Sequence, residues 1–196
     1  MLSHYLSSDD LFNTIFPAEQ LGNLISHLTP VNVALAAANF LTKDGNNNIA
    51  DIGSGPGKFC LIGGCTTTAK FTGIERRTEL INIAEVLAES FCLDKVSFVD
   101  ANINEIDFSV FDGFYLFNPF YENIESGARM DQQFPYSYKL YQEYTAYVQQ
   151  QLAEMPLGTK VAAFHGSHKE IPSSFRSEDH PNISELKLFT KKFRGG

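Results

Sequence analysis

The sequence predicts an α/β fold: a doubly wound, mostly parallel sheet with a helical N-terminal extension. The first observation is that apolar, strand-like runs alternate with helical patterns between residues 48 and 165. This alternation is typical of a parallel sheet covered by helices on both faces. The second is that the 196 residues, 43% of them hydrophobic, suffice for one domain with a complete core but not for two ordinary domains. The third is a glycine-rich turn directly after the first expected strand.

The N-terminal part of the chain is expected to be helical. Residues 1–28 carry apolar side chains at helical spacing, and Pro17 divides them into two short helices. Pro30 opens a third helix with an apolar body that reaches Leu41, and the turn-forming residues 44–48 end it. We therefore expect residues 1–43 to form an extension or lid and residues 44–196 to form the main domain.

The remaining elements follow from the apolar runs of the main domain. Strands are expected at 49–52, 70–75, 96–100, 111–117, 160–165 and 186–193, and helices at 58–65, 78–91 and 138–152. The run 111–117 is apolar on both faces, as a central parallel strand should be. The last helix carries Tyr138, Tyr141, Tyr144 and Tyr147 on one broad face, which favours packing against the sheet over a platform for stacking bases.

Charge and cysteine content narrow the function classes. Lys and Arg number 15 against 23 Asp and Glu, and the net charge of −8 argues against broad duplex nucleic-acid binding. The three cysteines form no Cys-x-x-Cys pair, so neither a disulfide framework nor a metal site is expected. The N-terminus shows no signal-peptide pattern, and no apolar stretch approaches the length of a membrane span. We expect a cytoplasmic protein without a membrane anchor.

The glycine-rich turn indicates a nucleoside site. Gly53, Gly55 and Gly57 follow the first strand and precede a helix, where glycine lets the backbone turn tightly near a ligand. Glu75, at the end of the second strand, can accept the hydroxyl hydrogens of a ribose. The dinucleotide fingerprint fails because Lys58 stands where its third glycine belongs, and no Gly-Lys-Ser/Thr of a P-loop follows. The carboxylate of Asp51 suits a ligand with a positive amino group better than a pyrophosphate.

The segment Asp51-Ile52-Gly53-Ser54-Gly55-Pro56-Gly57 resembles motif I of the class I S-adenosylmethionine-dependent methyltransferases, which have a Rossmann-like fold. The likeness covers roughly residues 48–165, and Thr72-Gly73-Ile74-Glu75 followed by Arg77 is similar to the family's second motif. The resemblance implies that S-adenosylmethionine is the cofactor, with Glu75 holding the ribose. It also implies that Asp100 and Ala101 contact the adenine. The implied cofactor-binding residues are Asp51, Gly53, Ser54, Gly55, Gly57, Glu75, Arg76, Asp100 and Ala101.

The segment Phe117-Asn118-Pro119-Phe120-Tyr121 ends the fourth expected strand and is a candidate acceptor site. Amine-directed members of the family carry Asp/Asn-Pro-Pro-Tyr/Phe there, so that carbonyl oxygens accept from the target amine and an aromatic ring stacks on it. Here Phe120 takes the place of the second proline if Asn118 is the polar acceptor. The alternative register leaves Phe117 at the acceptor position. The candidate catalytic residues are Asn118, Pro119, Phe120 and Tyr121.

The predicted activity is methyl transfer from S-adenosylmethionine to a nitrogen nucleophile, as in EC class 2.1.1. The partner would be a protein side chain, a small amine or a nucleobase in a short RNA element. The N-terminal helices and residues 122–136 are expected to cover the site. Two alternatives stay open: a non-catalytic S-adenosylmethionine-binding module and, with less support, an NAD-dependent oxidoreductase. His165 and His168 could act as a base, but a structural or surface role is favoured. The sequence does not indicate the oligomeric state.

Overall fold

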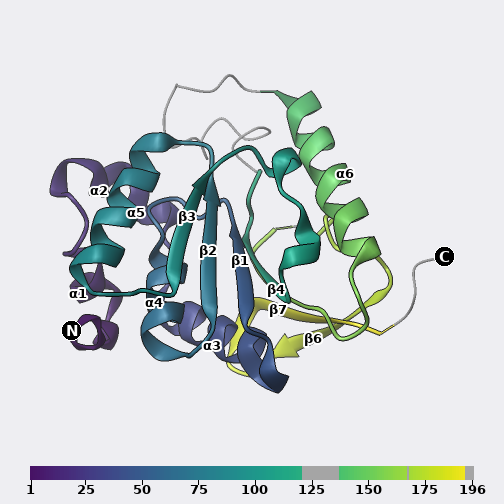
Figure 1. Ribbon diagram of the computed structural model, residues 1–196, viewed down its shortest axis with the longest axis horizontal. Helices are drawn as coiled ribbons and strands as arrows, with labels where there is room; N and C mark the ends of the chain where they lie inside the picture. The colour runs from purple at the N-terminus through teal and green to yellow at the C-terminus, as the bar shows by residue number, and fades with distance from the viewer. Residues whose placement is uncertain (121–136, 167, 193–196) are drawn as a thin grey trace.

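A computed structural model describes residues 1–120, 137–166 and 168–192. The strands in these residues form a seven-stranded sheet in the order β3-β2-β1-β4-β5-β7-β6 (Figure 1). The first five strands are parallel, and β7 runs antiparallel to both β5 and β6. The strands are β1 (Asn48–Ile52), β2 (Lys70–Glu75), β3 (Val96–Asp100), β4 (Gly113–Phe117), β5 (Lys160–Phe164), β6 (Phe175–His180) and β7 (Ile183–Lys191). The predicted mostly parallel sheet is confirmed.

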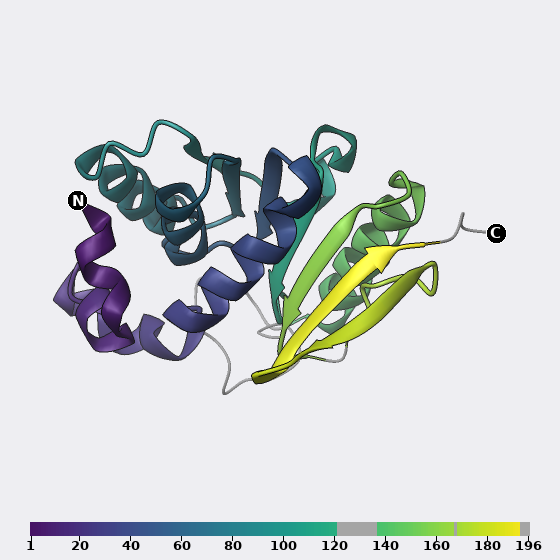
Figure 2. The same cartoon turned by 90° about the horizontal axis from the view of Figure 1, so that it is seen from below.

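Helices cover both faces of this sheet. Figure 2 shows α3, α4 and α5 on one face and α6 on the other. The α-helices are α1 (Asp9–Asn13), α2 (Ala18–Leu24), α3 (Val31–Thr42), α4 (Lys58–Thr66), α5 (Thr78–Ser90) and α6 (Tyr138–Glu154). Short 3₁₀ turns connect them: η1 (Leu2–Ser7), η2 (Ile25–His27), η3 (Lys43–Gly45), η4 (Ile103–Glu105) and η5 (Phe108–Val110). The doubly wound arrangement predicted from the alternating pattern is therefore present.

Alternate side chains of the central strands enter two separate core layers. In β4, Tyr115 packs in the layer beneath α3, α4 and α5, whereas Phe114 and Leu116 pack in the layer beneath α6. Successive side chains of a strand point to opposite faces, so a strand buried on both sides must be apolar throughout. This explains why the β4 run could be identified from sequence, although the strand begins at Gly113 rather than at residue 111.

The strand β6 was not predicted. Its sequence from Arg176 to Asp179 is polar and exposed, and only Phe175 at its start is buried. It lies at the edge of the sheet and is held by its hydrogen-bonded register with β7, which an apolar pattern does not report. The last strand also begins at Ile183, three residues earlier than expected. Before Pro17, where one short helix was expected, the structure has the 3₁₀ turn η1 and the helix α1.

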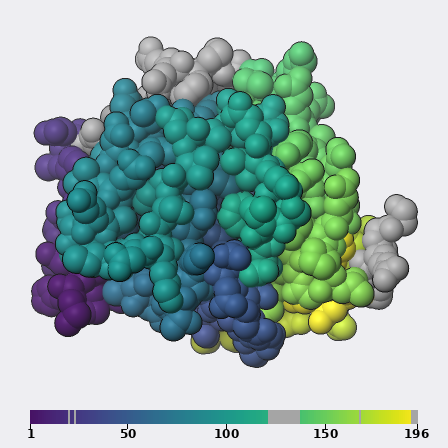
Figure 3. All heavy atoms as spheres, viewed as in Figure 1, coloured from purple at the N-terminus to yellow at the C-terminus, as the bar shows by residue number. Residues whose placement is uncertain are grey.

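The N-terminal segment packs against the domain. The buried side chains of α3, such as Ala37 and Leu41, share one core layer with β1 and β4. The buried Lys160 of β5 donates from its Nζ to the carbonyl oxygens of Phe40 (3.2 Å) and Lys43 (2.9 Å), which fixes the end of α3. In Figure 3 the N-terminal residues lie along one edge of the molecule, away from α6. A domain boundary at residue 43 stays a prediction.

Candidate functional site

A cavity of about 330 Å³ lies at the carboxyl ends of the parallel strands. In an open α/β sheet this edge is where ligands bind, and the volume lies within the range of small-molecule sites. The cavity is lined by the segment before α3, the turn after β1 with the start of α4, the ends of β2, β3 and β4, and Tyr144 of α6. The lining residues include Ser26, His27, Leu28, Thr29, Asp51, Gly53, Ser54, Lys58, Glu75, Arg76, Ala101, Asn102, Ile103, Tyr115, Asn118, Pro119, Phe120 and Tyr144.

The glycine turn has the conformation that its sequence indicates. Gly53, Gly55 and Gly57 have φ angles of +76°, +55° and +81°, in the left-handed region that favours glycine. The amides of Gly53 and Ser54 both donate to the carbonyl oxygen of Ile74, at 2.9 and 3.0 Å. At Gly57 a Cβ would lie 2.5 Å from Cζ of Phe98. Backbone conformation and close packing therefore both require a glycine at position 57.

The carboxylate of Glu75 fastens this turn to β2. Oε2 accepts from the Gly55 amide at 3.1 Å, and Oε1 accepts from the amides of Arg76 (2.9 Å) and Arg77 (3.1 Å). The Arg77 guanidinium lies 3.5 Å from Oε1. A carboxylate offers about four acceptor positions. Oε1 is thus fully engaged, whereas Oε2 accepts one of these bonds and keeps a second position for a ligand in the cavity.

Asp51 is buried at the end of β1 and lines the same cavity. Burial raises its pKa to about 8; the thiol of Cys60, 3.6 Å from Oδ2, opposes this rise, and the negative charge of Glu75 adds to it. Removal of a carboxylate from water disfavours its charged form. At neutral pH the Asp51 side chain is therefore mostly protonated, and a cationic group placed in the cavity would favour its ionised form.

The turn after β4 approaches the glycine turn. A Cβ on Gly53 would lie 3.5 Å from Cβ of Pro119, so the two turns are in van der Waals range. Asn118 has a φ of +42°, a left-handed conformation that asparagine tolerates better than most residues. Its Oδ1 lies 2.8 Å from where a Cβ would stand on Gly166, whose own φ is +93°. The Asn118 amide thus occupies space that a side chain at position 166 would take.

Most of the residues expected at the site are gathered around this cavity. Gly55 and Gly57 support the turn without lining the cavity, and Asp100 does not line it either. The Asp100 side chain is exposed and accepts from Oγ1 of Thr78 at 2.5 Å, while the neighbouring Ala101 does line the cavity. Neither His165 nor His168 lines it. Tyr121 and the proposed cover 122–136 lie outside the described residues.

Several lining residues were not expected from the sequence. Lys58, Tyr115 and Asn102 carry no motif signal, and only the sheet topology brings them to the cavity. Tyr144 was expected to pack against the sheet; it is buried as expected, but its hydroxyl also donates to Oδ1 of Asn102 at 3.0 Å. Its ring lies 5.3 Å from that of Phe120, between centroids. A tyrosine that spans core and cavity cannot be recognised from helical spacing alone.

Two negative findings concern the described residues only. No group of three or more His, Cys, Asp or Glu side chains there is placed to hold a metal ion. None of the helices found in this part of the chain is long and apolar enough to cross a membrane.

Solved structures share this fold. An RNA methyltransferase from Salinibacter ruber, in complex with S-adenosyl-L-homocysteine, is 20% identical with a TM-score of 0.57, over 83% of this chain and 90% of that one. A putative caffeoyl-CoA O-methyltransferase from Staphylococcus aureus is 12% identical with a TM-score of 0.55, over 93% and 96%. This chain has the class I methyltransferase fold. No protein-family model matches the sequence, and no curated protein matches it significantly.

The class I methyltransferase fold does not by itself fix the reaction. The [4+2]-cyclase SpnF also matches, at 17% identity and a TM-score of 0.53, over 67% of this chain and 43% of the cyclase. One fold can host different chemistry, so activity must be argued from the residues of the cavity.

Proposed function

We propose that the protein is an S-adenosylmethionine-dependent methyltransferase that acts on a nitrogen nucleophile. The observation that carries the proposal is the meeting of two motifs in one cavity. The glycine turn after β1 and the Asn118-Pro119 turn after β4 are in van der Waals range of each other. Such an arrangement would bring a methyl donor and an amine acceptor together, and proximity and orientation are the main contribution of the protein to this reaction.

The residues around the glycine turn fit S-adenosylmethionine. Oε2 of Glu75 keeps an acceptor position for a ribose hydroxyl, and Asp51 can ionise opposite the amino group of the methionine part. The hydroxyl oxygen of Ser54 is buried and has no hydrogen-bond partner within the described residues, which leaves it available to a ligand. Ala101 and Ile103 provide an apolar wall on which an adenine could lie. When bound, the cofactor supplies a methyl group activated by the positive charge of its sulfur.

Asn118 would orient the acceptor. Its side-chain carbonyl can accept a hydrogen bond from an amine, and this would direct the nitrogen lone pair toward the methyl group. The Phe120 ring, which lies beside that of Tyr144, would form an apolar side of the acceptor pocket. As the nitrogen takes the methyl group, its excess proton leaves to solvent or to the substrate's own surroundings. A protein side chain, a small amine and a base in a short RNA element remain the proposed acceptors.

Two measurements test the proposal. Calorimetric titration with S-adenosylhomocysteine, with NADH as control ligand, should show binding of the first ligand alone. Release of S-adenosylhomocysteine from S-adenosylmethionine is then followed over panels of proteins, short RNAs and small amines. Asn118→Ala should lower turnover on the acceptor so found by about a hundredfold or more, because a misplaced acceptor loses the orientation effect. Its affinity for S-adenosylhomocysteine should stay close to that of the wild type.

The exposed Asn82 on α5 provides a matched control, and Asn82→Ala should leave both turnover and binding unchanged. Loss of ligand affinity in Asn118→Ala would contradict the role given to Asn118. Wild-type binding of S-adenosylhomocysteine without transfer to any acceptor would favour the non-catalytic binding module, and binding of NADH alone would favour the oxidoreductase. We also propose a cytoplasmic location, since Cys60, Cys65 and Cys92 are all free thiols.

A further inference from the structure

A buried lysine joins the N-terminal segment to the glycine turn. Lys58 is the first residue of α4, directly after Gly57, and only 2% of its surface is exposed. Its Nζ donates to Oδ1 of Asp9 at 2.6 Å and to Oδ1 of Asn13 at 2.8 Å, both on α1. A buried charge needs such partners, because burial without them costs several kcal/mol. The methyl-transfer scheme above gives this contact no role.

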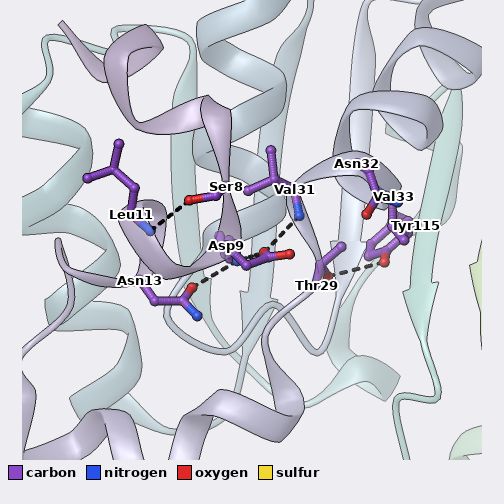
Figure 4. A network of polar contacts seen from close by, with 10 residues as sticks. Ser8, Asp9, Leu11, Asn13, Thr29, Val31, Asn32, Val33 and Tyr115 are labelled. Atoms are coloured by element: carbon purple, nitrogen blue, oxygen red, sulfur yellow. Dashed lines mark hydrogen bonds and ion pairs between the residues drawn. The ribbon is translucent and has the colours of Figure 1, made fainter.

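The same carboxylate oxygen also reaches the start of α3. Oδ1 of Asp9 accepts from the backbone amide of Val31 at 2.9 Å. Val31 is the first residue of α3, and the preceding Pro30 offers no side-chain cap. Asp9 therefore caps α3 from another helix, as the dashed line from Val31 in Figure 4 shows. It does so while it pairs with Lys58. One oxygen atom connects α1, the start of α3 and the end of the glycine turn.

The segment directly before α3 is a wall of the cavity. Residues 26–29 line it. Oγ1 of Thr29 lies 3.1 Å from the phenolic oxygen of Tyr115 on β4, and Figure 4 draws the two side chains facing each other. Tyr115 in turn stacks on Phe59 of α4, with ring centroids 4.0 Å apart. Thr29 thus connects this wall to β4. Two residues later in the chain, Val31 is connected to α4 through Asp9, which contacts both Val31 and Lys58.

We propose that Asp9, Asn13 and Lys58 form a latch that holds the wall of residues 26–29 against the glycine turn and thereby sets the affinity for the methyl donor. These are positioning residues: Asp9 and Asn13 act through Lys58 and Val31. A ligand in the cavity lies against both the wall and the turn, so it binds more tightly when the two are already held together. The inference rests on the proposed function, since the ligand is the proposed donor.

The test compares two neighbouring residues of α1. Asp9 and Asp10 both lie in its first turn and affect the helix dipole alike, but Asp10 is exposed and makes none of the latch contacts. Titration with S-adenosylhomocysteine should show affinity about tenfold weaker in Asp9→Ala, a typical coupling between two parts of a site. Asp10→Ala should bind as the wild type does. Equal affinity in Asp9→Ala and wild type would refute the latch.

A second variant addresses the chance that Asp9→Ala fails to fold. The double variant Asp9→Ala/Lys58→Met removes both charges and keeps an apolar side chain of similar length at the cavity. It should fold more readily than Asp9→Ala, because no unpaired charge stays buried, and its affinity for S-adenosylhomocysteine should be no weaker than that of Asp9→Ala, because the single variant has already lost the latch. Strictly additive losses from Asp9→Ala and Lys58→Met would show that the two side chains do not act together.

Hydrogen exchange can show whether the latch positions residues 26–29 for the ligand or only stabilises the fold. In the wild type, S-adenosylhomocysteine should slow exchange across residues 26–34, and in Asp9→Ala this ligand-dependent slowing should be largely lost. A latch that only stabilised the fold would change exchange equally with and without ligand, which would overturn the proposal. If the wild type itself binds no S-adenosylhomocysteine, the proposed function fails; if only the Asp9→Ala effect is absent, the latch fails and the proposed function stands.

Discussion

The buried carboxyl of Asp51 should make the protein less stable as the pH rises from about 4 to about 8. In the folded protein the pKa of Asp51 is raised to about 8, mainly by burial. In the unfolded chain an aspartate ionises near its ordinary pKa of about 3.9. Between these values the folded state holds a proton that the unfolded state has released. The contribution of Asp51 to the free energy of unfolding is therefore fully present below about pH 4 and is lost as the pH rises through 8.

The expected size follows from the linkage relation. One proton bound in the folded state alone lowers the free energy of unfolding by about 1.4 kcal/mol for each pH unit. Between pH 6 and pH 8 the loss is about 2 kcal/mol, since the carboxyl is half ionised at the upper limit. Asp51→Asn keeps the size and shape of the side chain but cannot ionise. The variant should not show this loss. The difference in free energy of unfolding between Asp51→Asn and the wild type should therefore shift by about 2 kcal/mol in favour of the variant between pH 6 and pH 8.

Urea unfolding of both proteins at pH 6 and pH 8 measures this difference. Other titrating groups are common to both proteins and cancel in the comparison. The exposed Asp94 provides the control, and Asp94→Asn should follow the wild type at both pH values. The reasoning is refuted if Asp51→Asn and the wild type lose or gain stability in parallel between pH 6 and pH 8.

Two glycine substitutions test the packing around the cavity. Gly158→Ala is their shared control, because Gly158 has a φ of +91° and a Cβ added there would have no neighbouring atom within 4 Å. Gly57→Ala should destabilise the fold by about 3 kcal/mol in urea unfolding, because alanine is strained at a left-handed φ and its Cβ would clash with Phe98. If the loss is no larger than that of Gly158→Ala, the clash with Phe98 does not contribute. Gly166→Ala should displace the Asn118 amide and lower kcat by about tenfold while the affinity for S-adenosylhomocysteine is kept. An unchanged kcat would show that Gly166 does not position Asn118.

The glycine turn could be recognised from sequence because its requirements are local. Left-handed φ angles at Gly53, Gly55 and Gly57 are imposed by the turn itself, so the residue types reveal the conformation. The buried strands were recognised for a similar reason, since β4 must be apolar on both faces to enter two core layers. The edge strand β6 could not be predicted from the sequence, because its exposed, polar residues are ordered by hydrogen bonds to β7 and not by burial.

The contacts of single polar residues are harder to predict from the sequence. Asp100 follows its strand where an adenine contact was expected, yet its side chain turns to Thr78 and leaves Ala101 at the cavity. Lys58 counted only as a departure from the dinucleotide fingerprint, whereas in the fold it pairs with Asp9, 49 positions earlier. A sequence pattern reports neighbours along the chain and gives no sign of a partner so far away.

The class of the fold, the glycine turn and the position of Asn118 at a strand end could all be predicted from sequence, because each depends on backbone conformation or on burial of a continuous apolar run. Which side chains share the cavity depends on how the chain folds in three dimensions. The order of the strands brings β1 and β4 side by side and so places Gly53 against Pro119. The packing of α1 gives the buried Lys58 its counter-charge. The course of the chain before α3 brings residues 26–29 to the cavity. Such contacts join residues that are distant in sequence, and their energies depend on burial, which arises only when the chain has folded.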